Sequence, residues 1–348
     1  MSVQKRIEVG IAGLGRSGWD LHAKTLSHLS MYNVSAVMDP VVQRCDEAKK
    51  RFGCKTFERF DDLIAQELDL VVVASPSYQH AEQGIRALYA GKNVLIEKPM
   101  GCDLTEAEAL VEAAVKMGKL LTVNQNYRYR PAFRKVNEVV ASGVLGTLVQ
   151  IRFAVHDFAR RWDWQTLRGY GGGILNNHGA HLIDWALHFF DDEEPKISGA
   201  LVNTPLYAGD AESHAKIVIV PGDGPLIDLE LTHCNAFPQD NWVVMGTQGS
   251  LTGTDHRLRW KYFDVTQVPP IKLDMAPTPD RSYNREELPW ITEELVLPTD
   301  MSDDMVGLYR DLYETLCHDK PLAITPESVL RQMKVLERCR ELPTPQTR

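Results

Sequence analysis

Val9–Gly18 reads VGIAGLGRSG, an apolar run that leads directly into a glycine-rich turn. The run Ile7–Ala12 is typical of a buried β-strand, and a helical pattern begins inside the turn. Gly13 permits the tight bend, Gly15 lets a pyrophosphate approach the backbone, and Gly18 lets the helix pack closely on the strand. Free N–H groups and the positive end of the helix dipole would bind the phosphates. The residues predicted to bind them are Gly13, Leu14, Gly15, Arg16, Ser17 and Gly18.

An acidic residue ends the next predicted strand. Asp39 follows the apolar segment 34–38 and lies 21 positions beyond Gly18, counted as 39 minus 18. A carboxylate there accepts hydrogen bonds from a ribose 2′-OH and repels a 2′-phosphate. Pro40 follows, so the adjacent position offers no arginine to that phosphate. The sequence therefore predicts NAD as the cofactor; NADP is less favoured, although Arg44 and Lys49 lie close in the sequence.

The composition is that of an ordinary globular protein. The chain has 348 residues, of which 44% are hydrophobic and 24% charged, and its net charge is −9. This length predicts two domains, and an acidic chain without a basic block argues against a nucleic-acid partner. No stretch approaches the roughly 18 apolar residues of a membrane span. Six cysteines without a C-x-x-C pair indicate reduced thiols, and the absence of a secretory pattern in residues 1–6 predicts a cytoplasmic protein.

Residues 1–123 alternate short apolar strands with helical patterns. Strand signals occur at 7–12, 34–38, 70–74, 93–96 and 120–123, and helical patterns at 17–30, 41–52, 59–67, 78–90 and 103–117. Continuous apolar strands imply burial on both faces, as in a parallel sheet. Strand–helix alternation with short connections indicates a doubly wound fold. We predict an α/β cofactor-binding domain with such a sheet over residues 1–123.

The pattern changes after residue 123. Helices are predicted at 132–142 and 176–190, and strands at 147–155, 196–202, 215–220, 226–231, 241–245, 250–253 and 258–263. Several of these strands alternate polar with apolar residues, which indicates a mainly antiparallel sheet with one solvated or intersubunit face. Residues 124–300 are predicted to form this α/β substrate domain, with a long surface excursion at 266–300. Helices at 302–318 and 326–341 lie within the last predicted unit, 301–348.

Two stretches that follow strands of the first predicted domain carry candidate chemistry. Ser75, Pro76 and His80 follow the strand at 70–74. They are candidate cofactor contacts because strand ends line the ligand crevice of such sheets; the alternative is a proline turn before a capped helix. Glu97 and Lys98 end the next strand. Desolvation would lower the pKa of Lys98, and its ammonium would stabilise a developing alkoxide; the alternative is a surface lysine paired with Glu97.

A second glycine-rich stretch, 171–173, precedes a predicted helix. Asn177, His181 and Asp184 have i, i+4 and i+7 spacing, which places them on one helix face. Histidine is the natural general base near neutral pH, and Asp184 could orient its imidazole. A metal on His178 and His181 would need a third ligand that the pattern lacks, so no metal is predicted. Polar helix ends at a domain interface are the other alternative.

The combination of these motifs resembles the Gfo/Idh/MocA oxidoreductase family, named for glucose–fructose oxidoreductase, inositol dehydrogenase and a rhizopine-catabolism protein. The resemblance is carried by the turn 13–18, by Glu97-Lys98-Pro99, by 126–131 and by the run 171–184. It implies an NAD-binding Rossmann domain, a second domain whose open sheet often joins subunits, and C-terminal helices that return to the first domain. It also implies a homodimer or homotetramer that oxidises or reduces a carbinol of a sugar or cyclitol.

Carried over residue by residue, the resemblance implies that Lys98 and His181 are catalytic. The candidate substrate contacts are Asn177, Asp184, His156, Arg128 and Trp164. The chain departs from the family at Asn177, where many members have Asp. An amide can hydrogen-bond a hydroxyl but cannot take its proton, so the proton transfer falls to His181 with Lys98.

The sequence therefore predicts an NAD-dependent dehydrogenase or reductase acting on a sugar or polyol. Two other classes stay open: a glycosidase that oxidises its sugar transiently with bound NAD, and a non-catalytic sensor of NAD or sugar. The presence of both Lys98 and His181 favours the dehydrogenase.

Overall fold

The computed structural model describes residues 5–278, 281–297 and 302–345. Its first sheet has the strand order β3-β2-β1-β4-β5-β6, and every pair of neighbours is parallel. The strands are β1 (Ile7–Ala12), β2 (Tyr32–Met38), β3 (Lys55–Phe57), β4 (Leu70–Val73), β5 (Asn93–Ile96) and β6 (Leu121–Val123). Strands β4 and β5 are almost wholly buried apolar residues, as expected for a sheet covered on both faces. The predicted doubly wound parallel sheet is confirmed.

Helices connect these strands at nearly the predicted positions. They are α1 (Lys24–His28), α2 (Val42–Phe52), α3 (Phe60–Ile64), α4 (His80–Tyr89) and α5 (Leu104–Met117). The Asp103 carboxylate caps α5 by accepting a hydrogen bond from the Glu106 N–H at 2.8 Å. Gly118, in the left-handed region, ends the same helix. The turn after β1 differs from the prediction, because Ser17–Ala23 form a π-helix, η1, before α1 begins.

The second sheet has the strand order β14-β13-β12-β11-β7-β10-β9-β8, and only β7 and β10 pair in parallel. Its strands are β7 (Leu148–His156), β8 (Lys196–Val202), β9 (His214–Val220), β10 (Leu226–Thr232), β11 (Trp242–Gly246), β12 (Gly249–Gly253), β13 (Arg257–Tyr262) and β14 (Ile291–Val296). Helices α6 (Pro131–Ala141) and α7 (Ala180–Ala186) cover one face. Phe133 of α6 and Trp185 of α7 stack at 5.3 Å between ring centroids, and Trp185 lies 4.4 Å from Trp242 of β11. The predicted mainly antiparallel sheet is confirmed.

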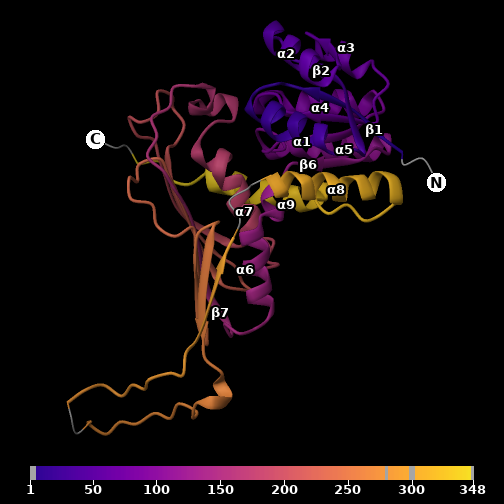
Figure 1. Cartoon of the computed structure of the whole chain (residues 1–348). Coiled ribbons are helices and arrows are strands. Elements are labelled where there is room, and N and C mark those ends of the chain that lie inside the picture. The colour runs from indigo at the N-terminus through magenta and orange to yellow at the C-terminus, as the bar shows by residue number, and fades with distance from the viewer. Residues whose placement is uncertain (1–4, 279–280, 298–301, 346–348) are drawn as a thin grey trace.

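Strand β14 lies inside the segment predicted as a surface excursion. It pairs antiparallel with β13, and nearly all of its side chains are exposed. The described part of the connection between these strands extends away from the body of the molecule (Figure 1). Its apolar side chains Ile271, Leu273 and Tyr283 are largely exposed.

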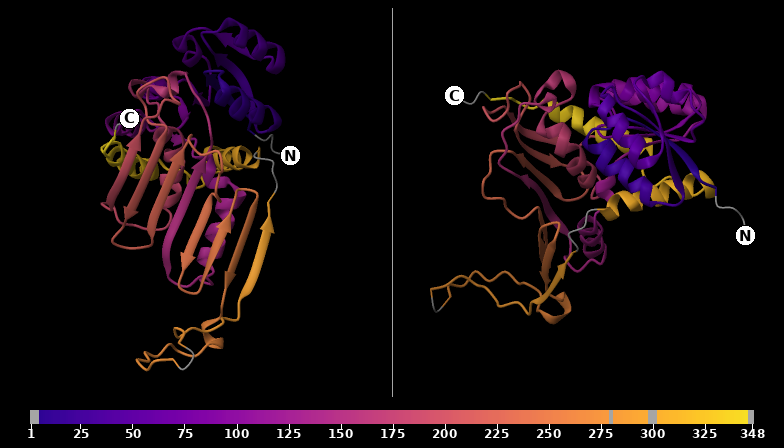
Figure 2. Two further views of the ribbon diagram at one scale, coloured as in Figure 1. Left: turned by 90° about the vertical axis from the view of Figure 1, so that its left-hand side faces the viewer. Right: turned by 45° about the horizontal axis from the view of Figure 1, so that its top comes forward.

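Helices α8 (Ser302–His318) and α9 (Pro326–Arg340) lie against the first sheet and its helices (Figures 1 and 2). The Tyr32 hydroxyl of β2 donates to the Tyr309 carbonyl of α8 at 2.7 Å, and the Thr122 hydroxyl of β6 donates to the Ile324 carbonyl at 2.8 Å. Helix α8 therefore packs on the elements around the first sheet, whereas α9 lies between α5 and β6 on one side and α7 and β8 on the other. The exact limits of the three predicted units stay predictions.

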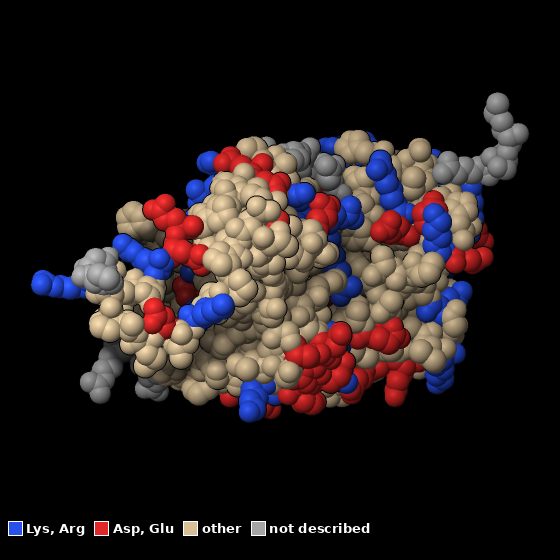
Figure 3. Space-filling model, turned by 90° about the horizontal axis from the view of Figure 1, so that it is seen from below, with Lys and Arg blue, Asp and Glu red and all other residues tan. Residues whose placement is uncertain are grey.

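Two observations describe the surface charge and the hydropathy of the helices. On the face seen from below, Lys and Arg side chains stand apart from one another, and several acidic side chains gather in one area (Figure 3). Within the described ranges, no helix has both the length and the apolar character needed to cross a bilayer.

Candidate functional site

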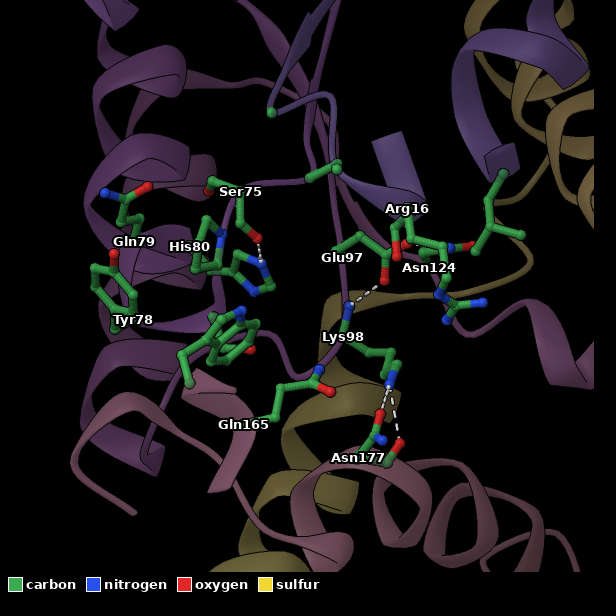
Figure 4. Close-up of a pocket in the computed structure, with 18 of the residues that line it drawn as sticks. Arg16, Ser75, Tyr78, Gln79, His80, Glu97, Lys98, Asn124, Gln165 and Asn177 are labelled. Atoms are coloured by element: carbon green, nitrogen blue, oxygen red, sulfur yellow. Dashed lines mark hydrogen bonds between the residues drawn. The ribbon is translucent and has the colours of Figure 1, made fainter. Parts of the chain in front are cut away.

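A cavity of about 830 Å³ lies along the carboxyl ends of the parallel strands. On one side it is lined by the turn after β1 and by residues that follow β2, β4, β5 and β6. On the other side it is lined by residues 161–165 and by residues of η6 (Leu175–Gly179) and α7. Segments far apart in the sequence therefore form one cavity, part of which is shown in Figure 4.

The glycine turn leaves space where a phosphate group would need it. Gly13 has φ +90°, and a Cβ there would lie 2.6 Å from the Ala74 carbonyl oxygen. At Gly18 a Cβ would lie 1.8 Å from the Gly13 carbonyl oxygen, whereas at Gly15 it would meet nothing within 4 Å. The backbone thus needs glycine at 13 and 18 for its own packing. Gly15 lines the cavity with Arg16 and Ser17, so its open side is available to a group bound there.

Asp39 is buried at the end of β2. Its Oδ2 accepts a hydrogen bond from the Leu14 N–H at 2.7 Å, and its Oδ1 accepts one from the Val41 N–H at 2.9 Å. The Arg44 guanidinium lies 3.2 Å from the same Oδ2. The predicted ribose-binding carboxylate therefore lines the cavity, with an arginine directly beside it.

His80 connects two strand ends. Its Nδ1 lies 2.8 Å from the Pro99 carbonyl oxygen and its Nε2 lies 2.9 Å from the Ser75 carbonyl oxygen. Burial lowers the pKa of His80. Ser75, Pro76 and His80 all line the cavity, but both ring nitrogens of His80 face backbone oxygens. This arrangement favours a structural role for its imidazole.

Lys98 reaches across the cavity from the end of β5 to η6. Its Nζ donates to the Asn177 backbone carbonyl at 2.9 Å and to the Asn177 side-chain Oδ1 at 3.2 Å (Figure 4). Burial lowers the pKa of Lys98 to about 8; the Glu97 carboxylate opposes this shift, and Arg16 adds to it. The ammonium is therefore held between the two halves of the site and is less basic than an ordinary lysine.

The neighbouring carboxylate of Glu97 is buried and held by several groups. Its Oε1 lies 3.1 Å from His22 Nε2 and accepts a hydrogen bond from Asn124 Nδ2 at 2.9 Å. Burial alone would raise the pKa of Glu97, but the contact with His22 and the positive charge of Lys98 bring it to about 2. Glu97 therefore carries a negative charge at neutral pH and supports the charged form of Lys98.

His181 lies in the same cavity as Lys98. Its Nδ1 is 3.0 Å from Gln125 Oε1, and its ring stacks on Tyr127 with 3.6 Å between centroids and 10° between planes. Nε2 has no hydrogen-bond partner among the residues that the structure describes. Burial, with the positive charges of Lys98 and Arg130, lowers the pKa of His181 well below its usual value. The imidazole is therefore neutral at pH 7.

Three residues predicted to contact substrate lie outside the cavity lining. Arg128 donates to both carboxylate oxygens of Asp184, from Nε at 2.8 Å and from Nη2 at 2.6 Å. His156 of β7 lies 3.0 Å from the Glu230 carboxylate on the second sheet. Each of these three side chains makes an ion pair or hydrogen bond within the protein, and their contact with a substrate stays a prediction.

The local helix geometry explains why Asp184 lies outside the cavity lining. Residues 175–179 form a π-helix, whose turn is wider than the 3.6 residues assumed for the i, i+4, i+7 spacing. Asn177 and His181 both line the cavity, as predicted, but Asp184 is 1% exposed and turned toward Arg128. A buried carboxylate needs such a partner. Trp164, from the 3₁₀ turn Trp164–Thr166, also lines the cavity.

Several lining residues were not predicted. They are Asn124, Asn126, Tyr127, Arg130, Arg161, Asp163, Gln165 and His178. The polar run that directly follows β6 was a usable signal, because polar residues at the end of a parallel strand face the ligand crevice. Asn124 Oδ1 is buried and lacks a hydrogen-bond partner in the described part of the chain, so it is available to a ligand. No group of three metal-ligating side chains was found among the described residues.

Comparison with known proteins identifies the family of both halves of the chain. Residues 7–125 match an oxidoreductase family model with an NAD-binding Rossmann fold, and residues 133–252 match a GFO/IDH/MocA C-terminal domain. Inositol 2-dehydrogenase from Rubrobacter xylanophilus is 33% identical over 71% of each chain. The scyllo-inositol 2-dehydrogenase (NADP(+)) IolW from Bacillus subtilis is 31% identical over 53% of this chain; the match spans about half of IolW, at 52%. An NAD-binding protein from Listeria innocua has the same fold, with TM-score 0.81, 25% identity and 97% coverage of both chains.

Proposed function

Since the chain belongs to the Gfo/Idh/MocA family of NAD-binding oxidoreductases, we propose that it is an NAD-dependent dehydrogenase acting on a carbinol of a sugar or cyclitol. One observation carries this proposal. Lys98, from the end of β5, and His181, from α7, line a single cavity with the glycine turn. Oxidation of a hydroxylated carbon releases a proton from its hydroxyl group and a hydride from the carbon. A neutral imidazole can accept the proton, a cation can stabilise the alkoxide, and a bound nicotinamide would accept the hydride.

The residues present fit a bound dinucleotide. The open side of Gly15 admits a pyrophosphate, the Asp39 carboxylate suits a ribose hydroxyl, and Asn124 Oδ1 is a buried acceptor that needs a donor. When bound, the nicotinamide supplies the hydride acceptor or donor. Asp39 favours NAD. Its neighbour Arg44 is the residue that would contribute most to binding the 2′-phosphate of NADP.

The charged Lys98 and the neutral His181 have complementary roles in the site. Below about pH 8 Lys98 is largely protonated, so its ammonium donates a hydrogen bond to the substrate oxygen and stabilises an alkoxide. Neutral His181 accepts the hydroxyl proton at its unpartnered Nε2. Asn177 holds the ammonium in place through two hydrogen bonds rather than taking part in proton transfer. Trp164 lines the cavity and offers an apolar surface to a sugar ring.

The test is a turnover screen of sugars and cyclitols with NAD⁺ and NADP⁺, followed by absorbance of the reduced nicotinamide. We expect NAD⁺-dependent turnover of at least one polyol. Lys98→Met is expected to lose turnover by about 10²–10³-fold, as for removal of a donor to an oxyanion, while NADH binding measured by fluorescence persists. An unchanged kcat in Lys98→Met would remove this residue from the chemistry, and hydrolysis of glycosides without net NADH formation would replace the dehydrogenase by a glycosidase.

The predicted homodimer or homotetramer through the open sheet is likewise a proposal. It is supported by the resemblance alone, and light scattering of the purified full chain tests it. A monomer at micromolar concentration would contradict it.

A further inference from the structure

We propose that Gln125 is a positioning residue that selects the tautomer of His181 with hydrogen on Nδ1, so that Nε2 presents its lone pair to the cavity. The catalytic meaning of this inference rests on the proposed dehydrogenase function. The tautomer itself is a property of the protein alone and can be measured without substrate.

The contact between the two side chains is direct and buried. Gln125 is fully buried just after β6, where its N–H donates to the Val123 carbonyl at 2.8 Å. Its Oε1 lies 3.0 Å from His181 Nδ1. A carboxamide oxygen only accepts hydrogen bonds, so with this orientation of the amide Nδ1 carries the hydrogen, while Gln125 Nε2 is buried with no hydrogen-bond partner among the described residues. A neutral imidazole has one N–H, and therefore Nε2 is left as the base.

The plane of the imidazole is fixed by a stack of three groups. The His181 ring lies 3.6 Å from the Tyr127 ring, and the Arg130 guanidinium carbon lies 3.1 Å from the same Tyr127 centroid. Because both lie so close to one centroid, they cover opposite faces of the tyrosine. Arg130 is held in turn by Asp255 at 2.8 Å. The stack fixes the ring plane, and Gln125 determines which edge of the ring faces away from the cavity.

An amide does this without charging the imidazole. The charged and titratable groups near His181 are Lys98 at the end of β5, Arg130 before α6 and His178 in η6, and all of them lower its pKa. The side-chain oxygen of Asn177 accepts a hydrogen bond from the Lys98 ammonium. A carboxylate beside Nδ1 would raise the pKa of the imidazole, whereas an amide orients it and leaves it neutral. The chain thus combines a fixed tautomer with a base that stays unprotonated in mildly acidic solution.

The first test is nitrogen NMR of the full chain labelled with ¹⁵N-histidine, with His181→Gln to assign its signals. We expect wild-type His181 to show a protonated Nδ1 and an unprotonated Nε2. In Gln125→Met, which keeps the volume but loses the amide, we expect the two tautomers to mix. A wild-type signal with hydrogen on Nε2 would overturn the proposal. Thermal unfolding of Gln125→Met establishes that the variant is folded.

The second test uses kinetics on a polyol that is turned over. Gln125→Met is expected to lower kcat by about tenfold to a hundredfold, within the range of general-base effects, with an unchanged Kd for NADH. Gln125→Glu should recover most of the lost kcat at high pH. It should also move the acid limb of kcat/KM to higher pH, by about one pH unit or more, because a carboxylate raises the pKa of the imidazole. A folded Gln125→Met with wild-type kcat would refute the positioning role. A protein that turns over no polyol but shows hydrogen on Nδ1 would refute the proposed function and leave the tautomer assignment standing.

Discussion

Asn177→Asp would place a carboxylate beside the ammonium of Lys98. The side-chain oxygen of residue 177 lies 3.2 Å from Lys98 Nζ, and the substitution changes its charge with almost no change in shape. Coulomb's law at this separation gives an attraction of about 1.3 kcal/mol at the dielectric constant of water and about 5 kcal/mol at an effective value of ~20. One pKa unit corresponds to about 1.36 kcal/mol, so we expect the pKa of Lys98 to rise from about 8 by at least about one unit.

The assay is kcat/KM against pH, followed by absorbance of the reduced nicotinamide. In the wild type, activity should fall as pH rises through about 8, because Lys98 loses the charge that stabilises the alkoxide. In Asn177→Asp this alkaline limb should move to higher pH. Asn235→Asp adds the same charge outside the cavity lining and should leave the limb in place. If Asn177→Asp is folded, binds NADH and keeps the wild-type limb, the assignment of that limb to Lys98 is refuted.

Four further substitutions test the cofactor turn and the ion pair of Asp184. Asp39→Ala should raise the Kd for NAD⁺ in calorimetry and lower the ratio of the Kd for NADP⁺ to the Kd for NAD⁺. The same ratio in the variant and the wild type would contradict the ribose assignment. Gly18→Ala should lower the free energy of unfolding by about 1–3 kcal/mol through the clash with the Gly13 carbonyl. Gly15→Ala should keep the wild-type Tm and weaken NAD⁺ binding; unaltered binding would remove the pyrophosphate from Gly15. Asp184→Asn should cost about 3–5 kcal/mol in urea unfolding, because Arg128 stays buried without its partner, with kcat retained; a large loss of kcat in folded protein would return Asp184 to the substrate site.

The parts that the sequence could predict depend on local signals. The bounds of β1 and β5 agree with the prediction because both are buried apolar runs bordered by turn residues. The glycine turn was predictable because the spacing of its glycines after an apolar strand is a local pattern. The clash that requires glycine at 18 also lies within the turn, whereas the one at Gly13 is with Ala74, far along the chain. Strand β14 was missed because its exposed side chains leave no alternation of burial to detect.

The sequence could not predict which side chains, far apart along the chain, contact one another. The side chain of Asp184 had several possible roles on a helix face, and only the folded chain shows that Arg128 takes it. The π-helical turn at residues 175–179 altered the spacing on which that prediction depended. Gln125 and His181 are 56 positions apart, and no local pattern joins them.

The position of α8 has a consequence for synthesis on the ribosome. Tyr309 is fully buried against the first sheet, with its hydroxyl 2.7 Å from His22 Nδ1 and its ring 5.3 Å from that of Tyr32. His22 in turn contacts the Glu97 carboxylate next to Lys98. The nascent sheet therefore emerges with an uncovered apolar surface and an incomplete charge network, and both are completed only after residue 309 has left the exit tunnel. A chain stalled before α8 would expose that surface to chaperones however much of the cofactor turn had already formed.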